Sequence, residues 1–137
     1  MKRIGVTTES REQLVDITRE VAGAVAASGL RDGAVLVYST HTTAGITINE
    51  NADPDVGTDL LAGLASMAPC DRGWLHCEGN SDAHIKASLV GSSVHIPVTE
   101  GRLGLGTWQG VFFCEFDGPR SRTVMIQTLA CAPPRSG

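Results

Sequence analysis

Short apolar runs, all of strand length, are the feature of this sequence that most constrains its fold. The longest uninterrupted stretches, such as residues 34–38, fall far short of the ~18 apolar residues that a membrane-spanning helix needs. Residues 1–6 include two basic side chains but no long apolar segment behind them, so no signal peptide is readable. We therefore expect a globular protein of the cytoplasm that has no membrane partner.

Two kinds of hydrophobic spacing distinguish the segments of the chain. Apolar side chains recur at helical spacing over residues 11–27, with Ser10 as the expected N-cap and Gly29 as a stop. Elsewhere apolar and polar side chains alternate, as they do in strands. We expect strands over residues 3–8, 34–39, 44–49, 94–99, 111–116 and 123–129, and helices over 11–27, 54–68 and 82–89.

Local signals mark the ends of these elements. Asp53 followed by Pro54 predicts a helix start, because the aspartate can cap the helix and proline suits its first position. Asn80 or Ser81 is expected to cap the third helix, which Gly91 ends. The pair Asp117-Gly118 predicts a hairpin between the last two strands. The resulting order, β-α-β-β-α-α-β-β-β, indicates an α+β fold with largely antiparallel pairing.

Length and composition favour a single domain. The 137 residues are enough to bury one core, and no linker or repeat divides them. We expect residues 1–131 to form the domain and 132–137 to be a frayed tail. The net charge of −4 and an aromatic content of 4% argue against a nucleic-acid partner, which requires a basic surface or stacking platforms.

The four cysteines point to thiols rather than to a metal site. Cys70, Cys77, Cys114 and Cys131 form no C-x-x-C pair, which argues against a zinc ribbon. In a cytoplasmic protein they should be reduced. Cys114 lies in an apolar strand and is expected in the core.

Three of the four histidines lie near segment ends, where sites are usually built. His41 follows a strand, His76 lies in a polar loop, and His84 falls in the first turn of a helix. The positive end of the helix should keep His84 neutral, as a metal ligand must be. Their spacing is a weak signal, however, and three ordinary surface histidines would give the same pattern. His95 alternates with apolar residues and is expected at the surface or packed on the sheet.

A group of carboxylates follows the strand that His41 precedes. Glu50, at the end of that strand, is the best candidate for a general base or for a partner of a metal-bound histidine. Asp53 is better explained as a helix cap and Asp55 as a solvated surface residue, whereas Asp59 stays open because leucines adjoin it.

Two segments carry groups that suit a phosphorylated or aromatic ligand. The glycines of residues 101–110 could present backbone N–H groups to a phosphate, or could simply form turns. Trp108 could border a pocket beside the amide of Gln109, or could pack in the core. Arg120 and Arg122 suit phosphate oxygens, but they could equally pair with Glu115 or Asp117, since Glu115 lies among apolar residues and needs a partner.

Several blocks together resemble the YjbQ-like proteins, often described as secondary thiamine-phosphate synthases. The similarity covers the chain to about Leu129. It is densest in STHTTAGITINE (39–50), HCEGNSDAH (76–84), IPV (96–98), GLGTWQG (104–110) and EFDGPRSR (115–122).

The resemblance implies a compact α+β fold with a β-sandwich-like core, and a homotrimer with sites near subunit contacts. It implies a divalent metal bound by His41, His76 and His84. Glu50 and His41 are then the expected catalytic residues. The expected substrate-binding residues are Asn80, Trp108, Gln109, Arg120 and Arg122.

The activity implied is the joining of a hydroxymethylpyrimidine pyrophosphate to a thiazole phosphate with release of pyrophosphate, as a main or a side activity. Three imidazoles favour zinc or a similar transition metal, whereas a pyrophosphate substrate is compatible with magnesium. Two alternatives stay open: a metal-dependent hydrolase of a small phosphorylated compound, and a protein that binds a metal or small ligand without turnover.

Overall fold

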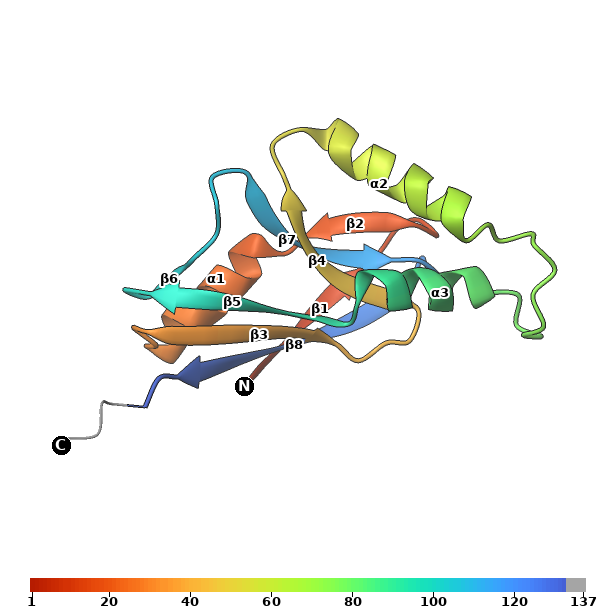
Figure 1. Ribbon diagram of the computed structural model, residues 1–137. Coiled ribbons are helices and arrows are strands. Elements are labelled where there is room, and N and C mark those ends of the chain that lie inside the picture. Colours follow the sequence, from red (N-terminus) through yellow and green to blue (C-terminus); the bar gives the residue numbers. More distant parts are fainter. Residues whose placement is uncertain (133–137) are drawn as a thin grey trace.

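Two antiparallel sheets and three helices form the protein in the computed structural model, which describes residues 1–132 (Figure 1). The five-stranded sheet contains, in spatial order, β1 (Lys2–Thr7), β8 (Ser121–Ala130), β3 (Gly33–Ser39), β5 (Ser93–Thr99) and β6 (Arg102–Leu103). The three-stranded sheet contains β2 (Gln13–Asp16), β7 (Gln109–Glu115) and β4 (Ala44–Glu50). The helices are α1 (Thr18–Ser28), α2 (Pro54–Met67) and α3 (Ser81–Val90). This confirms the predicted α+β class and its antiparallel core; residues 133–137 of the expected tail lie outside the described range.

The main core lies between the two sheets. Alternate side chains of β3 and β8, such as Val35 and Ile126, face Ile46 and Phe113 of the smaller sheet, and all four are at most 1% exposed. Val21 brings α1 into the same core. This arrangement follows from the period-two pattern of the strands, which places one apolar face of each sheet inward.

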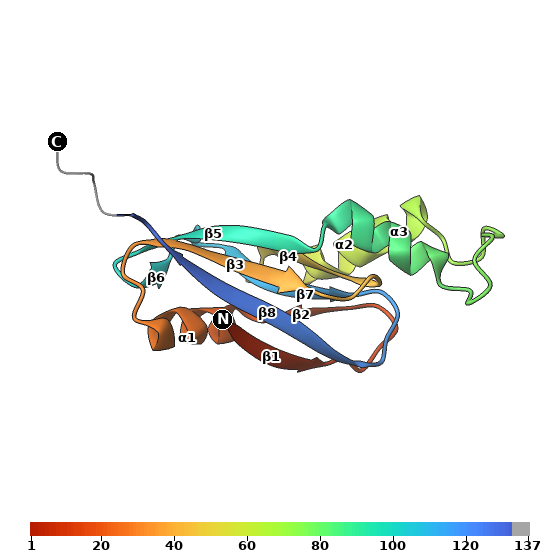
Figure 2. The same cartoon turned by 90° about the horizontal axis from the view of Figure 1, so that it is seen from below.

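A second apolar layer covers the outer face of the three-stranded sheet. Cys114 and Phe116 point away from the main core and are packed against Ala83 and Ala87 of α3 and against Leu64 of α2. The predicted burial of Cys114 is confirmed, and burial raises the pKa of its thiol to about 12. In both views α1 lies toward one end of the sheets and α3 toward the other (Figures 1 and 2).

The start of α2 and the end of α3 lie where their local signals predict. Asp53 accepts a 2.9 Å hydrogen bond from the N–H of Asp55, with Pro54 at the first helical position of α2. Gly91 ends α3. Asn80 is the residue before α3, but its side chain does not cap the helix. No helix of residues 1–132 is both long and apolar enough to cross a membrane.

The predicted helix over residues 11–27 is wrong over residues 11–17, because α1 begins only at Thr18. Residues 13–16 form β2, which pairs with β7 so that Leu14 lies opposite Cys114. Leu14 packs in the outer layer and Val15 in the main core, an alternation that only a strand allows. Helix α1 starts instead after Asp16, whose carboxylate accepts the N–H of Thr18 at 2.9 Å, so Ser10 is not its N-cap.

The predicted hairpin at Asp117-Gly118 is also wrong. Strand β7 belongs to the three-stranded sheet and β8 to the five-stranded sheet, so this segment carries the chain from one sheet to the other. Gly118 donates its N–H to the carbonyl of Arg11 at 2.9 Å. A Cβ at this glycine would lie 2.3 Å from the carbonyl oxygen of Ser10. The glycine therefore serves a close backbone approach rather than a two-residue turn.

Candidate functional site

The structure divides the predicted site residues between the two ends of the β4–β7 ladder. Ala44 of β4 lies opposite Glu115 at one end, and Glu50 lies opposite Gln109 at the other. Six residue steps along a strand separate these ends by roughly 20 Å. One set of predicted residues gathers at the Glu115 end: His41, His76, Asn80, His84, Arg120 and Arg122. The other set lies at the far end: Glu50, Trp108 and Gln109.

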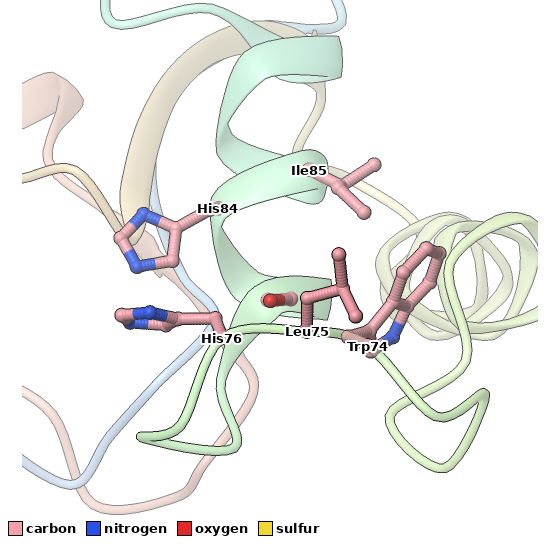
Figure 3. Close-up of a pocket in the computed structure, with 6 residues that line it drawn as sticks. Trp74, Leu75, His76, His84 and Ile85 are labelled. Carbon is pink, nitrogen blue, oxygen red and sulfur yellow. The ribbon is translucent and has the colours of Figure 1, made fainter.

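His76 and His84 lie side by side at the start of α3. Their ring centroids are 5.5 Å apart, and the ring planes are nearly perpendicular at 81°. Figure 3 shows the two imidazoles on one side of a pocket, with Trp74, Leu75 and Ile85 on the other. We call this the Trp74 pocket; it has a volume of about 540 Å³ and is lined by Trp74, Leu75, His76, Ser81, His84 and Ile85.

The apolar wall of the Trp74 pocket is built by the loop before α3. The indole Nε1–H of Trp74 donates to the carbonyl of Pro69 at 2.9 Å, and the guanidinium of Arg72 lies 5.4 Å from the ring centroid. Leu75 is fully exposed. Sequence reasoning missed Trp74 and Ile85, although a tryptophan two residues before His76 was an available signal.

His41 lies in the loop between β3 and β4 and borders a second pocket of about 550 Å³. We call this the His41 pocket; it is lined by His41, Thr42, Ala44, His84, Ala87, Ser88, Gly91 and Ser92. His84 therefore borders both pockets. The Nε2 atom of His41 accepts a 2.9 Å hydrogen bond from the backbone N–H of Thr123. Burial lowers the pKa of His41, and the nearby guanidinium of Arg122 lowers it further.

The three predicted metal ligands are not assembled as a triad within this chain. Over residues 1–132, no group of three histidine, cysteine or carboxylate side chains is arranged to hold a metal ion. His76 and His84 are adjacent and fit two positions of a transition-metal site. In this arrangement the Nε2 atom of His41 accepts the Thr123 N–H.

Arg122 forms a buried ion pair with Glu115, which is one of the alternatives that the sequence left open. The guanidinium Nε donates to the carboxylate at 2.8 Å, and a terminal nitrogen donates to the hydroxyl of Thr43 at 2.8 Å. Burial alone would raise the pKa of Glu115, but hydrogen bonds from Arg122, the Asp117 N–H and Thr8 lower it overall. Arg122 is thus committed to the protein rather than open to a phosphate.

Arg120 and Asn80 both bind Asp117. Arg120 donates to the Asp117 carboxylate at 3.1 Å, and Asn80 Nδ2 donates to it at 2.8 Å. The Oδ1 atom of Asn80 is buried without a hydrogen-bond partner among the described residues. Arg120 is exposed, so it is the more accessible of the two predicted arginines.

A buried charge cluster beneath α3 was not predicted from the sequence. Lys86 is 1% exposed and donates to Asp82 at 2.9 Å and to Glu12, while Arg11 binds Asp82 through two 2.9 Å hydrogen bonds. Burial alone would raise the pKa of Asp82, but the bonds from Arg11 and Lys86 lower it to about 2. The i, i+4 spacing of Asp82 and Lys86 was the available signal. This cluster fixes α3, and with it His84, to the segment before β2.

The far end of the ladder holds the remaining predicted residues. Trp108 is 62% exposed, so it is not a core residue. Gln109 accepts the N–H of Gly106 at 2.8 Å, so Gly106 forms a turn, whereas Gly104 donates to the carbonyl of Pro97 at 2.7 Å and extends the pairing of β5 with β6. Glu50 borders a groove beneath α2. Within one chain, this carboxylate is out of reach of the histidines.

Comparisons with known proteins agree with this architecture. The family described as "UPF0047 protein YjbQ-like" matches residues 2–131. The UPF0047 protein YugU of Bacillus subtilis is 51% identical over 94% of this chain and 98% of its own length.

Solved structures of similar proteins share the fold. A yjbq/upf0047 family protein of Clostridium acetobutylicum superposes with a TM-score of 0.93 at 51% identity, covering 94% of this chain and all of that one. A "YbjQ-like protein of unknown function" from Sulfolobus solfataricus gives a TM-score of 0.92 at 36% identity, over 94% and 95% of the two chains. The chain therefore belongs to the YjbQ-like (UPF0047) family.

Proposed function

We propose that this chain is a small transferase of the secondary thiamine-phosphate synthase type. It would join a hydroxymethylpyrimidine pyrophosphate to a thiazole phosphate. The observation that carries the proposal is that His84 borders two pockets, each of 540 to 550 Å³. Volumes of this size suit small ligands. A reaction of two small substrates needs two such spaces that meet at one point, and the shared imidazole supplies that point.

The reaction forms a bond between the thiazole nitrogen and the methylene carbon of the pyrimidine. The bond from that carbon to the pyrophosphate oxygen breaks, and pyrophosphate leaves with the electron pair. Holding both partners against His84 would supply proximity and orientation. The exposed apolar wall of Trp74, Leu75 and Ile85 suits one ring, and the neighbouring imidazoles and first turn of α3 suit its phosphate.

Two side chains of this site are placed to hold a metal. His76 and His84 would hold a divalent transition metal of the zinc class, which would stabilise negative charge on the departing pyrophosphate. Magnesium would instead be bound mainly by pyrophosphate oxygens. We place the reaction in the cytoplasm and in a homotrimer, following the sequence and its resemblance to the family.

The test is product formation from the two substrates, measured by mass spectrometry with zinc or magnesium added. His84→Ala should lower the rate by about a hundredfold or more, because it removes the wall that both pockets share. His95→Ala is the matched control, since His95 is exposed on β5, and it should stay within about twofold of wild type.

Other outcomes of the same assay would contradict the transferase proposal. Release of inorganic phosphate from the thiazole phosphate without coupling would support a metal-dependent hydrolase. Binding of either substrate without any product would support a binding protein without turnover. Unchanged turnover in His84→Ala would move the site away from α3.

A further inference from the structure

The role of His41 can be derived from its hydrogen bond to the backbone. The N–H of Thr123 carries its proton in every state, so the Nε2 of His41 must act as the acceptor. A neutral imidazole has one protonated nitrogen and one bare nitrogen. Because Nε2 is the unprotonated nitrogen, the proton of neutral His41 lies on Nδ1. The ring then has no lone pair left for a metal, but it does have one N–H to donate.

The surroundings of His41 stabilise this state. Arg122 holds the His41 loop through its 2.8 Å hydrogen bond to Thr43, and the buried Glu115 fixes the guanidinium in place. Burial and Arg122 both lower the pKa of His41, which favours the neutral ring. Arg122 thus acts on His41 by position and by charge, whereas Glu115, whose charge raises the pKa of His41, serves to hold Arg122 in place.

His41 also borders the His41 pocket, whose lining limits what a donor of this ring can meet there. Its described lining contains the hydroxyl residues Thr42, Ser88 and Ser92 and no carboxylate. Ser88 lies in the last turn of α3, Gly91 is its C-cap and Ser92 follows it. The pocket therefore borders the C-terminal end of the helix, where the helix dipole is negative and disfavours anions. Phosphate is therefore better placed at the opposite end of α3, by the Trp74 pocket. The His41 pocket suits a neutral ring that offers an acceptor to His41 and a donor to the hydroxyl oxygens.

We infer that His41 is a neutral hydrogen-bond donor that binds an uncharged aminopyrimidine-like ring in the His41 pocket, and that it is not a third metal ligand. This inference deepens the proposed function, on which the choice of a pyrimidine rests. It assigns the pyrimidine to the His41 pocket and the thiazole phosphate to the Trp74 pocket, with His84 between them.

The first test is the tautomer of His41 in the full chain, read from long-range 1H–15N spectra of 15N-histidine-labelled protein at neutral pH with a chelator present. Single His→Gln variants at the other three positions assign the signals. We expect the Nδ1–H pattern for His41. An Nε2–H pattern, or a zinc-induced shift of His41 together with His76 and His84, would overturn the inference.

The second test is binding of simple probes, followed in the same spectra. 4-Aminopyrimidine should shift the Nδ1 signal of His41. Aniline, which keeps the amino group but lacks the ring nitrogens, should not shift it. A shift with inorganic pyrophosphate but not with 4-aminopyrimidine would overturn the choice of a neutral ring.

Two substitutions separate the donor role from mere packing. The amide of His41→Asn lies near the Nδ1 position and keeps a donor there, whereas that of His41→Gln lies near the Nε2 position. We expect His41→Asn to keep the affinity for 4-aminopyrimidine and His41→Gln to lose about tenfold, the worth of one hydrogen bond. Equal losses would contradict the donor role. These binding measurements need no turnover. The inference about His41 can therefore be confirmed when the transferase assay finds no product, and it can be contradicted when that assay finds product.

Discussion

At the scale of single residues, buried charges rather than apolar contacts distinguish the end of the molecule that holds His41, His76 and His84. Glu115 is 0% exposed, and its ion pair with Arg122 joins β7 of one sheet to β8 of the other. The sequence allowed this pair to be proposed, because a carboxylate among apolar neighbours needs a cation. The sequence could not show that this ion pair joins two different sheets, since Asp117-Gly118 was expected to form a hairpin within one sheet.

Breaking this pair on one side should be costly. Arg122→Met leaves the Glu115 carboxylate buried without its cation, and we expect the free energy of unfolding to fall by about 3–5 kcal/mol. The double variant Glu115→Leu/Arg122→Met removes both charges and should recover most of that loss. Urea denaturation of the three proteins measures both effects. A loss well below 1 kcal/mol in the single variant would show that the pair is not buried as described.

The cluster beneath α3 should make stability depend on pH. The pKa of Asp82 is about 2 in the folded protein against a reference of 3.8. Its stabilising contribution is therefore present above the unfolded pKa and is lost as pH falls through about 2. The difference between the folded and the reference pKa of Asp82 corresponds to about 2 kcal/mol of folding stability.

The measurement is the free energy of unfolding between neutral pH and the acid limit of folding, for wild type and Asp82→Asn. Wild type should lose stability more steeply below about pH 4 than the variant, which cannot titrate at this position. Asp71→Asn, in the exposed loop, is the control and should follow wild type. Parallel curves for wild type and Asp82→Asn would contradict the assignment.

At the scale of elements, locally encoded signals were predicted well and pairing partners were not. Asp53-Pro54 and Gly91 mark helix ends by their own chemistry, so α2 and the end of α3 were predictable. Residues 13–16 were not, because Leu14 lies at helical spacing from Ile17 and Val21 and so fits a helix as well as a strand. Their pairing with β7, almost a hundred residues later in the chain, decides between the two.

The contact between α3 and β4 gives a sharper prediction for this element. A Cβ added to Gly45 would lie 2.7 Å from the carbonyl oxygen of Gly91, which accepts the N–H of Ile46 at 3.0 Å. We expect Gly45→Ala to displace the end of α3 and to destabilise the protein by about 1–3 kcal/mol.

The matched control is Gly23→Ala in the middle of α1, where an added Cβ meets nothing within 4 Å. Alanine loses less backbone conformational freedom on folding than glycine does, so this substitution should stabilise the helix by roughly 0.5–1 kcal/mol. Thermal unfolding of both variants gives the comparison. Destabilisation of similar size at both positions would mean that close packing at Gly45 is not the cause.

At the scale of the whole molecule, the sequence predicted which residues bear chemistry better than where they meet. Histidines and arginines in the recognisable blocks do gather at one end. Glu50 follows His41 by only nine positions, yet β4 carries it to the other end of the ladder. Proximity along an extended strand is therefore a poor guide to proximity in space. Trp108 and Gln109 were predicted to bind substrate, and the structure places them at this far end as well.

The separation of Glu50 from the histidines gives a prediction about the assembly. If Glu50 acts in catalysis, it must act at the histidines of another copy, and the family resemblance implies a trimer. Light scattering should then give about three times the 14.4 kDa chain mass.

Glu50→Gln and His84→Ala should each lose turnover alone. A refolded mixture of the two should regain part of it, because some interfaces would combine an intact Glu50 with an intact His84. A monomer mass would contradict the assembly. Full turnover in Glu50→Gln would instead leave the chemistry to the histidine end of a single chain.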